Sequence, residues 1–591
     1  MMSEHKRLFP IEPDRSRLLG ELWHCQQTEG YISAAAIGRL AQAHHLAVIE
    51  VEGVASFYHF FHRTPGGKHM IYLNNSIISE VKGFEKIKNA FEKETGARTG
   101  SVDPTGTFGL FTTSCIGLSD QEPAALIDFY PFVNLDEKKV KSIVQQLREG
   151  KKAADICDTP QDHIRYLPEN NGSILFAPYM PGEAVSILPS LGPEGIISLI
   201  REAEVRGRGG AFFQTCRKWE ACQKQPASPK FIICNADEGE PGTFKDRVLL
   251  NSQTGSVLEG MIIAGYTVGA QYGIIYLRGE YRWLAEKIQQ TIDAFRAQGL
   301  LGVHVGGIKG FKFDIRIEIG AGAYVCGEET ALLESMEGKR GEPRTKWFFP
   351  VEKGYLQLPT VINNVETFST IARLLPMGIT EYSKRGIPGS PGTKLISISG
   401  DCQLPGIYEI EWGMSVGALL DACQAIDPYL IQVSGPSGNA LSMAEKHRRI
   451  STPGSGVEDG ITCGGAFMVF NKTTDLLQIL LNFATFFKHE SCGICTPCRA
   501  GNFIIQRKLE HLFRGTGDMD DLQDLKKWAI IMEASSRCGL GKTAGNALMD
   551  TLDKFNDYFA ARLPASDQSG IRPFDMAAAA KDYEQFKPTA Q

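Results

Sequence analysis

Three cysteines spaced by two residues constrain this chain more than any other feature. Cys492, Cys495 and Cys498 lie in "HESCGICTPC", residues 489 to 498, and the next cysteine downstream is Cys538. Three close thiolates and a remote fourth are typical of a [4Fe-4S] cluster, because two-residue gaps let one tight loop direct three sulfurs at one object. The chain must therefore fold so that a second segment brings Cys538 to that loop.

Zinc is the alternative ligand for these cysteines. Structural zinc sites more often use two separated C-x-x-C pairs or add a histidine, and His489 lies close by. Glycines flank Cys538 in "RCGLGK" and would permit close approach of a bulky inorganic core. We interpret the four cysteines as ligands of a [4Fe-4S] cluster, which carries one electron at a time and requires a partner that supplies or accepts electrons.

Length and composition indicate a soluble, multidomain α/β protein. At 591 residues the chain exceeds one hydrophobic core, and a net charge of only -6 does not favour nucleic acid as a partner. The first residues carry no apolar run, so we expect no secretory signal and a cytoplasmic location. The apolar run 476–487 is too short to span a bilayer, which excludes membrane insertion there and predicts a buried core helix.

The order of strand-like and helix-like segments predicts several domains. Helical spacing and then a compact α/β pattern occupy the first part of the chain, and apolar-periodic stretches without strand signals close it. The predicted units are a helical plus α/β domain (1–150), a linker (151–175), a layered α/β domain (176–392), a small β-grasp sheet (393–472), a helical bundle (473–562) and a loose tail (563–591).

Four motifs in the layered domain predict a ligand crevice. They are "RGRGGAFF" (206–213), "CNADEGEPGTFKDR" (234–247), "GAGAYVCGEETALLESMEG" (320–338) and "LPTVINNVETFS" (358–369). The glycines do not form the usual G-x-G-x-x-G fingerprint, and turns or close packing would also explain them. A helix starting directly after a strand and a glycine turn nevertheless leaves free N–H groups for a phosphate, at the sheet edge where open α/β sheets bind ligands.

Together with the cysteine motif, these motifs resemble the family of NADH-binding flavoprotein subunits, which includes the 51 kDa-type subunit of respiratory complex I. The resemblance covers roughly residues 170 to 560. It implies FMN, NAD(H) and one [4Fe-4S] cluster, held by a Rossmann-like domain, a ubiquitin-like β-grasp domain and a helical bundle. Phe212 and Gln214 stand where the family usually has Gly and Pro, and Gly239 replaces a common Ser, so we expect the nucleotide pocket to differ from the family in its fine shape.

Carried over position by position, the resemblance implies a set of site residues. Those implied for FMN are Gly207, Arg208, Gly209, Lys218, Asn235, Asp237, Glu238, Tyr324, Gly327, Glu328, Asn363, Asn364 and Thr367. Those implied for the nicotinamide nucleotide are Phe213, Glu240, Glu329, Lys346 and Phe349. Because flavin N5 exchanges hydride directly, no side chain is needed as acid or base, although Glu240 could support the step. Glu240 and Glu329 would repel the 2'-phosphate of NADPH, so NADH is the expected substrate.

The first 150 residues resemble a thioredoxin-like 24 kDa-type subunit of the same complex, which holds a [2Fe-2S] cluster on four cysteines. The matching positions here are Asn74, Ser79, Cys115 and Ser119. One thiolate cannot hold that cluster, so we expect a metal-free docking domain.

This fusion most resembles the diaphorase flavoprotein subunit of cytoplasmic NAD-reducing [NiFe] hydrogenases. The implied partners are an iron–sulfur electron-transfer subunit and catalytic hydrogenase subunits in a hetero-oligomer. A flavoprotein subunit of NAD-dependent formate dehydrogenase is the main competing interpretation, and a non-catalytic docking scaffold is the alternative from another class. Nothing in the chain binds nickel or molybdenum, so these residues do not identify the terminal electron partner.

Overall fold

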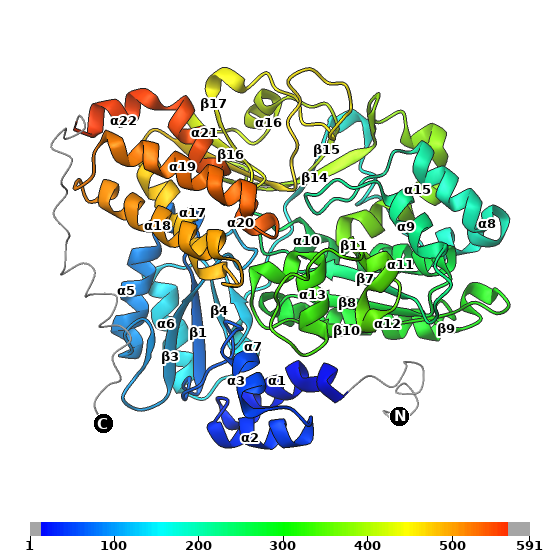
Figure 1. The fold of residues 1–591 in the computed structure, drawn as a ribbon, viewed down its shortest axis with the longest axis horizontal. Coiled ribbons are helices and arrows are strands. Elements are labelled where there is room, and N and C mark those ends of the chain that lie inside the picture. Colours follow the sequence, from blue (N-terminus) through cyan, green and yellow to red (C-terminus); the bar gives the residue numbers. More distant parts are fainter. Residues whose placement is uncertain (1–13, 565–591) are drawn as a thin grey trace.

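The computed structural model describes residues 14–564. The predicted tail therefore lies almost wholly outside the described residues, as do the first 13 residues, from which we expect no secretory signal. Figure 1 shows the N-terminal sheet at the lower left, the sheet of the layered domain at the lower right, a third sheet above them and the C-terminal helices over the left side.

The N-terminal region combines short helices with a mixed five-stranded sheet. Strands β1 and β3 are parallel in register, so their ends at Asn74 and Thr113 lie at the same edge of the sheet. Helices α5 and α6 bury Phe91 and Val144 against one face of it. The helices are α1 (Leu18–Glu29), α2 (Ala34–Ala43), α3 (Val48–Ala55), α4 (Ile77–Val81), α5 (Phe84–Thr95), α6 (Glu137–Arg148) and α7 (Ala153–Ile156). The strands are β1 (His69–Asn74), β2 (Ser101–Val102), β3 (Phe108–Thr113), β4 (Ala125–Ile127) and β5 (Tyr130–Phe132), in the order β2-β3-β1-β4-β5.

The second sheet is the centre of the layered domain and has the order β11-β7-β8-β10-β9. Its first four strands run parallel, and helices cover both faces. The strands are β7 (Phe231–Ala236), β8 (Tyr272–Leu277), β9 (Gly302–Val303), β10 (Lys312–Ile319) and β11 (Thr360–Asn364). The helices are α8 (Glu183–Glu202), α9 (Thr215–Gln223), α10 (Lys245–Ser252), α11 (Thr254–Val268), α12 (Ala285–Ala297), α13 (Glu329–Met336), α14 (Pro350–Lys353) and α15 (Val365–Tyr382).

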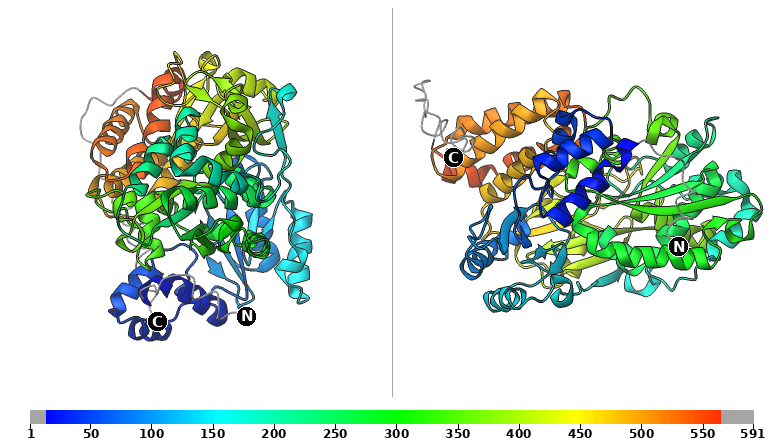
Figure 2. Two further views of the ribbon diagram at one scale, coloured as in Figure 1. Left: turned by 90° about the vertical axis from the view of Figure 1, so that its right-hand side faces the viewer. Right: turned by 90° about the horizontal axis from the view of Figure 1, so that it is seen from below.

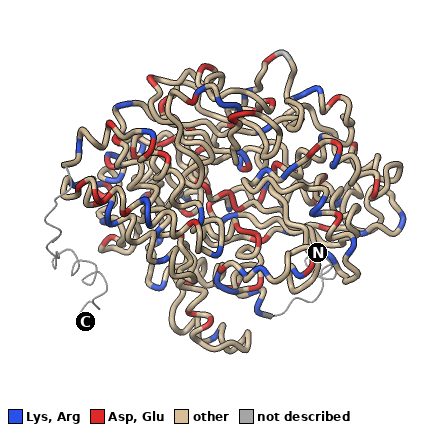
Figure 3. The backbone as a smooth tube through the Cα atoms, turned by 45° about the horizontal axis from the view of Figure 1, so that its top comes forward, with Lys and Arg blue, Asp and Glu red and all other residues tan. Residues whose placement is uncertain are grey.

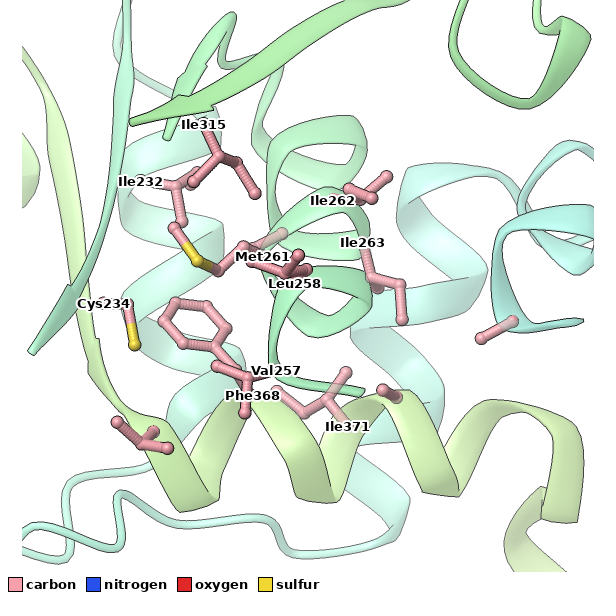
Figure 4. Close-up of a cluster of buried hydrophobic side chains, with 14 of the residues drawn as sticks. Ile232, Cys234, Val257, Leu258, Met261, Ile262, Ile263, Ile315, Phe368 and Ile371 are labelled. Carbon is pink, nitrogen blue, oxygen red and sulfur yellow. The ribbon is translucent and has the colours of Figure 1, made fainter. Parts of the chain in front are cut away.

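Side chains of β7 alternate between two hydrophobic cores, as the pleat of a strand requires. Ile232 and Cys234 face α11 and α15, where they meet Met261 and Phe368 (Figure 4). Ile233 points to the opposite face. This arrangement gives the run "KFIIC" two buried faces, which is typical of a central parallel strand.

The opposite face of the same sheet is covered by the N-terminal helices and α13. One buried cluster contains Leu22 of α1, Ile233 of β7, Leu332 of α13 and Phe487 of the C-terminal helices. Figure 2 shows the first helices lying across the junction between the layered domain and the C-terminal helices when the molecule is viewed from below. The N-terminal region therefore shares a core with the rest of the chain.

The third sheet has six strands in the order β17-β16-β18-β14-β15-β6, with α16 (Val416–Ala422) packed against it. The strands are β6 (Ile164–Leu167), β14 (Thr393–Gly400), β15 (Gly406–Glu411), β16 (Pro428–Val433), β17 (Asn439–Ser442) and β18 (Ala466–Asn471). Strands β12 (Gly386–Ile387) and β13 (Ser390–Pro391) form a separate small hairpin.

Strand β6 corrects the prediction that residues 151–175 are only a linker. It pairs in parallel with β15 at the edge of the third sheet. Its four side chains are all half-buried, so it has no apolar alternation that a sequence pattern could reveal. Backbone pairing and a hydrogen bond of 2.9 Å from the Tyr166 hydroxyl to Glu411 fix it instead.

Helices without strands close the chain, in agreement with the sequence pattern. They are α17 (Leu476–Glu490), α18 (Thr496–Phe513), α19 (Met519–Ser535), α20 (Gly539–Thr543), α21 (Asn546–Lys554) and α22 (Asn556–Arg562). The predicted core helix is confirmed as α17, which buries Leu477, Leu480 and Phe487. By length and composition, α8 alone among the described helices could cross a membrane, but it breaks at Gly192 and packs against α11 and α15.

Candidate functional site

The four parallel strands of the second sheet end at one edge, and the predicted motifs meet there. Strand β7 leads into Asp237, β10 into the turn before Tyr324, and β11 ends in Asn363 and Asn364. The carboxyl edge of an open parallel sheet is where such folds bind ligands. We call this region the crevice.

Asn235, Asp237 and Gly327 form one wall of the crevice. The Asn235 amide donates to the Gly327 carbonyl over 2.9 Å, and its oxygen accepts from the Asp237 backbone N–H over 3.1 Å. A Cβ on Gly327 would lie 3.3 Å from the Asp237 carbonyl, so the two segments approach as closely as glycine allows. One carboxylate oxygen of Asp237 is buried without a protein partner. A buried acceptor with no partner here fits a ligand that donates hydrogen bonds, as the flavin ring does.

The glycine loop lies against α15. The Arg208 backbone N–H donates to the Thr367 hydroxyl over 3.0 Å, and a Cβ on Gly209 would lie 3.4 Å from the Asn364 Cβ. The Arg208 guanidinium lies 4.9 Å from the Trp412 ring centre and donates to the Tyr382 hydroxyl over 3.3 Å. Its Nε and Nη1 atoms are buried without a partner among the described residues, so Arg208 offers unused donors in addition to its backbone contact with Thr367.

Lys218 reaches the crevice from α9. Its ammonium group donates to Glu329 and to the Ile362 carbonyl, each over 3.0 Å. The neighbouring Trp219 indole donates to Asn363 over 2.9 Å. Lys218 thus lies at the crevice as an ion pair with Glu329, and its contact with a phosphate stays a prediction.

Glu238 and Glu328 hold helices in place. The Glu238 carboxylate accepts from the backbone N–H groups of Asp246 at 2.9 Å and Arg247 at 3.1 Å, and from the Tyr281 hydroxyl at 2.8 Å. Burial raises the pKa of Glu238 to about 7. Glu328 caps α13. Both carboxylates are occupied within the protein, which indicates that they shape the crevice from behind.

The predicted nucleotide residues fall into two groups. Phe213 and Phe349 are 54% and 63% exposed, and Lys346 is also exposed. Glu240 is held by the Tyr324 hydroxyl and by the Ser437 backbone N–H, which donates over 2.8 Å. Burial raises the pKa of Glu240 to about 6. The two aromatic rings are thus free to meet a planar ligand, while the carboxylate is fixed.

Two family departures are explained by packing. Phe212 is 5% exposed and fills the core of the third sheet, although its φ of 52° is unusual for a bulky residue. A Cβ on Gly239 would lie 2.8 Å from the Tyr324 ring, so the serine common in the family has no room here. The backbone of the crevice is kept, whereas the side chains packed around it differ from those usual in the family.

A buried charge network behind the crevice was missed at the sequence level. Lys245 contacts Asp246 at 2.7 Å and Glu366 at 3.1 Å, and Lys394 contacts Glu366 at 2.6 Å. Burial opposes ionisation of Glu366, but Lys394 and Lys245 outweigh it and lower its pKa to about 2. Burial lowers the pKa of Lys394 to about 8. Lys245 and Asp246 belong to the charged motif that we assigned to the crevice wall, whereas no local signal marks Lys394.

The four predicted cluster cysteines come together. Cys492, Cys495 and Cys498 lie at and just before the start of α18, and Cys538 lies directly before α20. A Cβ on Gly541 would lie 3.0 Å from the Cys498 Cβ, so this glycine lets the two segments approach. Cys498 and Cys538 are buried in the same apolar cluster, and Cys492 and Cys495 pack against it. A sulfur-lined site packed against apolar side chains fits an iron–sulfur cluster.

Within residues 14–564, no three His, Cys, Asp or Glu side chains form a group that could hold a single metal ion. The grouping of the four cysteines therefore rests on their shared burial, and the preference for a cluster over zinc rests on the C-x-x-C-x-x-C spacing of the loop.

The N-terminal positions do not fit a [2Fe-2S] cluster. Asn74, Ser79, Cys115 and Ser119 are buried, and the Cys115 sulfur lies 3.5 Å from the Ser119 hydroxyl. The Asn74 amide donates to Glu122. With one thiol among the four positions, this site lacks the donors that such a cluster requires.

A cavity of about 1010 Å³ lies where the N-terminal region, the layered domain and the C-terminal helices meet. Its lining includes Cys115 of the N-terminal region, Glu280 of the layered domain, and Glu490 and Cys492 at and after the end of α17. We call this cavity the junction groove. It gives access to the cysteine loop from outside the crevice.

Three family models match the chain in this order. Residues 5–148 match the thioredoxin-like [2Fe-2S] ferredoxin, residues 200–373 the Nuo51 FMN-binding domain, and residues 478–562 the NADH-ubiquinone oxidoreductase-F iron-sulfur binding region. The predictions of a thioredoxin-like N-terminal domain, an FMN domain and a [4Fe-4S] region are thereby confirmed. The fold and the site define an FMN- and iron–sulfur-containing oxidoreductase subunit of the NADH-dehydrogenase type.

Full-length similarity narrows this class. The chain is 44% identical to the NAD-reducing hydrogenase HoxS subunit alpha of Cupriavidus necator, over 97% of this chain and 96% of that protein. It is 38% identical to the NADP-reducing hydrogenase subunit HndC of Solidesulfovibrio fructosivorans over 64% of this chain and 78% of that protein. A crystal structure of an NAD+-reducing [NiFe]-hydrogenase in the H2-reduced state superimposes with a TM-score of 0.88 and 34% identity, covering 98% of this chain and 97% of that one. The chain belongs to the family of alpha subunits of NAD-reducing hydrogenases, which are diaphorase flavoproteins that use FMN, an iron–sulfur cluster and NAD(H).

Proposed function

We propose that this chain is the diaphorase subunit of a cytoplasmic NAD-reducing hydrogenase, which couples H2 + NAD+ to NADH + H+. One observation carries the proposal: a single chain places the crevice and four converging thiols in one body, and 97% of it aligns with such a subunit.

The residues of the crevice supply position and charge. FMN, when bound, exchanges hydride with the nicotinamide and single electrons with the cluster. Asn235, Asp237 and Gly327 would face the flavin ring, and Lys218 would offset its phosphate. Phe213 and Phe349 would stack on the nucleotide. The remaining predicted FMN and nucleotide residues keep the same proposed roles, with Arg208 offering its backbone N–H and the unpartnered nitrogens of its guanidinium, and Glu238 and Glu328 acting as caps.

The junction groove is the proposed docking place for the iron–sulfur partner subunit. Its lining reaches Cys492, so a partner seated there would lie next to the cluster. Four glutamates line it, Glu80, Glu85, Glu280 and Glu490, against one arginine, Arg340. This charge favours a partner segment rich in Lys and Arg, because opposite charges across an interface steer association.

We also propose finer domain assignments. The second sheet is Rossmann-like, the third sheet with α16 is a ubiquitin-like β-grasp domain, and α17–α22 form a helical bundle. The proposed boundaries are those expected from the sequence, except that β6 adds the segment before residue 176 to the third sheet.

Purification from the native host tests the proposal. The complex that contains this chain should carry nickel, iron and FMN, and it should reduce ferricyanide with NADH. Molybdenum in place of nickel would identify a formate dehydrogenase flavoprotein instead. Folded protein without FMN or iron would indicate a docking scaffold, because the crevice and the thiols would then be unused.

A further inference from the structure

The last residue of α17 joins three parts of the molecule. One oxygen of the Glu490 carboxylate accepts from the Tyr324 backbone N–H over 2.8 Å, and the other accepts from the Ser114 hydroxyl over 3.1 Å. Tyr324 belongs to the crevice, Ser114 directly follows strand β3 of the N-terminal sheet, and Glu490 precedes Cys492 by two residues. A single carboxylate therefore contacts the crevice and the N-terminal domain from the base of the cysteine loop.

Other contacts also hold Tyr324 in place. Its ring packs edge-on against Phe486, with ring centres 5.0 Å apart, and its hydroxyl bonds to Glu240 and Ser437. The Gly239 backbone closes off the space beside the ring. A displacement of the Tyr324 backbone would thus move the crevice wall as a unit, because both ends of the residue are held.

The N-terminal side of the contact is equally fixed. The carbonyl of Cys115, next to Ser114, accepts from the buried Arg278 guanidinium over 2.8 Å, and Arg278 also donates to the Glu238 carbonyl. A Cβ on Gly117 would overlap the Tyr281 hydroxyl, so this loop lies directly on the layered domain. The loop is rigid enough to serve as an anchor for Glu490.

From these contacts we infer that Glu490 is a positioning residue that fixes the crevice relative to the cysteine loop, with Ser114 of the metal-free N-terminal domain as its support. The inference rests on the proposed function, since it concerns electron transfer between the two sites. Tunnelling rates fall steeply with distance, so a small shift between the sites would slow transfer without altering either site alone. The N-terminal domain thereby acquires a role beyond docking.

The test uses the full chain in its complex, with variants Glu490→Ala, Glu490→Gln, Ser114→Ala and the control Glu137→Gln. Glu137 is an exposed carboxylate of the N-terminal domain that pairs with Lys86 at 3.2 Å and does not line the junction groove. In metal-free protein, amide hydrogen exchange around Tyr324 should rise about tenfold in Glu490→Ala, because the buried acceptor of the Tyr324 backbone N–H is lost. Glu490→Gln keeps an acceptor oxygen and should exchange nearly as the parent does.

In loaded protein, rapid freeze-quench electron paramagnetic resonance should show the NADH-reduced cluster appearing about tenfold more slowly in Glu490→Ala. Ser114→Ala should give a smaller change in the same direction, while iron content, FMN content and ferricyanide reduction stay within about twofold. Unchanged exchange and unchanged cluster reduction in Glu490→Ala would overturn the inference. Loss of iron or FMN in that variant would also overturn it, because Glu490 would then act on binding. Failure of the unmodified chain to reduce its cluster with NADH would instead refute the proposed function.

Discussion

At the scale of single residues, Glu240 is a side chain whose charge can be changed without moving it. It is fixed by Tyr324 and Ser437, and its pKa is raised to about 6, so it is ionised above that pH and neutral below it. We predict that Glu240→Gln lowers the preference for NADH over NADPH about tenfold well above pH 6, because repulsion of the 2'-phosphate is lost.

The pH profile supplies the control for this prediction. The preference of the parent, measured as a ratio of kcat/KM values, should fall towards that of the variant as pH falls through about 6. Protonation of the 2'-phosphate itself affects both proteins equally and cancels in the comparison. Parallel profiles with equal preference would show that Glu240 does not face the adenosine ribose.

Residue types that carry chemistry were predictable, and their orientations were not. The four cysteines and the two amides of β11 are marked by spacing and by position after a strand. The orientation of Arg208 depends on Trp412 and Tyr382, which lie in distant segments, so the sequence motif could not predict it. Glu490 has no recognisable role in the sequence, because its partners lie 166 and 376 positions away.

At the scale of elements, α10, α15 and β14 meet through the network of Lys245, Glu366 and Lys394. We predict that Glu366→Gln destabilises the layered domain by about 3–5 kcal/mol, because it leaves two buried ammonium groups with too little compensating charge. The change in stability can be measured by thermal unfolding, using the rise in FMN fluorescence when quenching by the protein is lost. Adding Lys394→Met to the variant should restore part of the stability, and a neutral effect of Glu366→Gln alone would contradict the argument.

The stabilisation by this network should be lost over a defined range of acidic pH. The folded-state pKa of Glu366 is about 2, below its ordinary value of 4.5, so its stabilisation is complete above pH 4.5 and is lost as pH falls from there towards 2. The difference in stability between the parent and Glu366→Gln should therefore narrow within that window.

Strong periodicity was a reliable guide to elements, and backbone pairing without it was not. The apolar run of α17 and the central strand β7 follow directly from their patterns. Strand β6 escaped prediction because its side chains are half-buried and its stability comes from an edge that the fold provides. Tertiary contacts therefore determine that this segment is a strand, whereas the sequence pattern indicated a linker.

At the scale of the whole molecule, one apolar cluster runs from α1 through the second sheet to the cysteine loop. Lys and Arg are interspersed with Asp and Glu over most of the backbone (Figure 3). Buried ion pairs add to this continuity. Arg247 of α10 contacts Asp120 of the N-terminal domain at 3.3 Å and Asp162 at 3.2 Å.

Shared cores and buried cross-domain charges predict that the N-terminal and layered domains unfold together. Asp120→Ala should lower the stability of the whole body by about 3 kcal/mol, because it leaves Arg247 buried with a single, partly exposed partner in Asp162. Replacing the pair with apolar side chains, Asp120→Leu with Arg247→Met, should recover most of that loss, since a buried ion pair and a hydrophobic pair are often nearly equivalent. Differential scanning calorimetry should show one main transition that moves as a unit in Asp120→Ala. Two transitions, of which only one moves, would mean that the N-terminal domain is attached to the flavoprotein without sharing its stability.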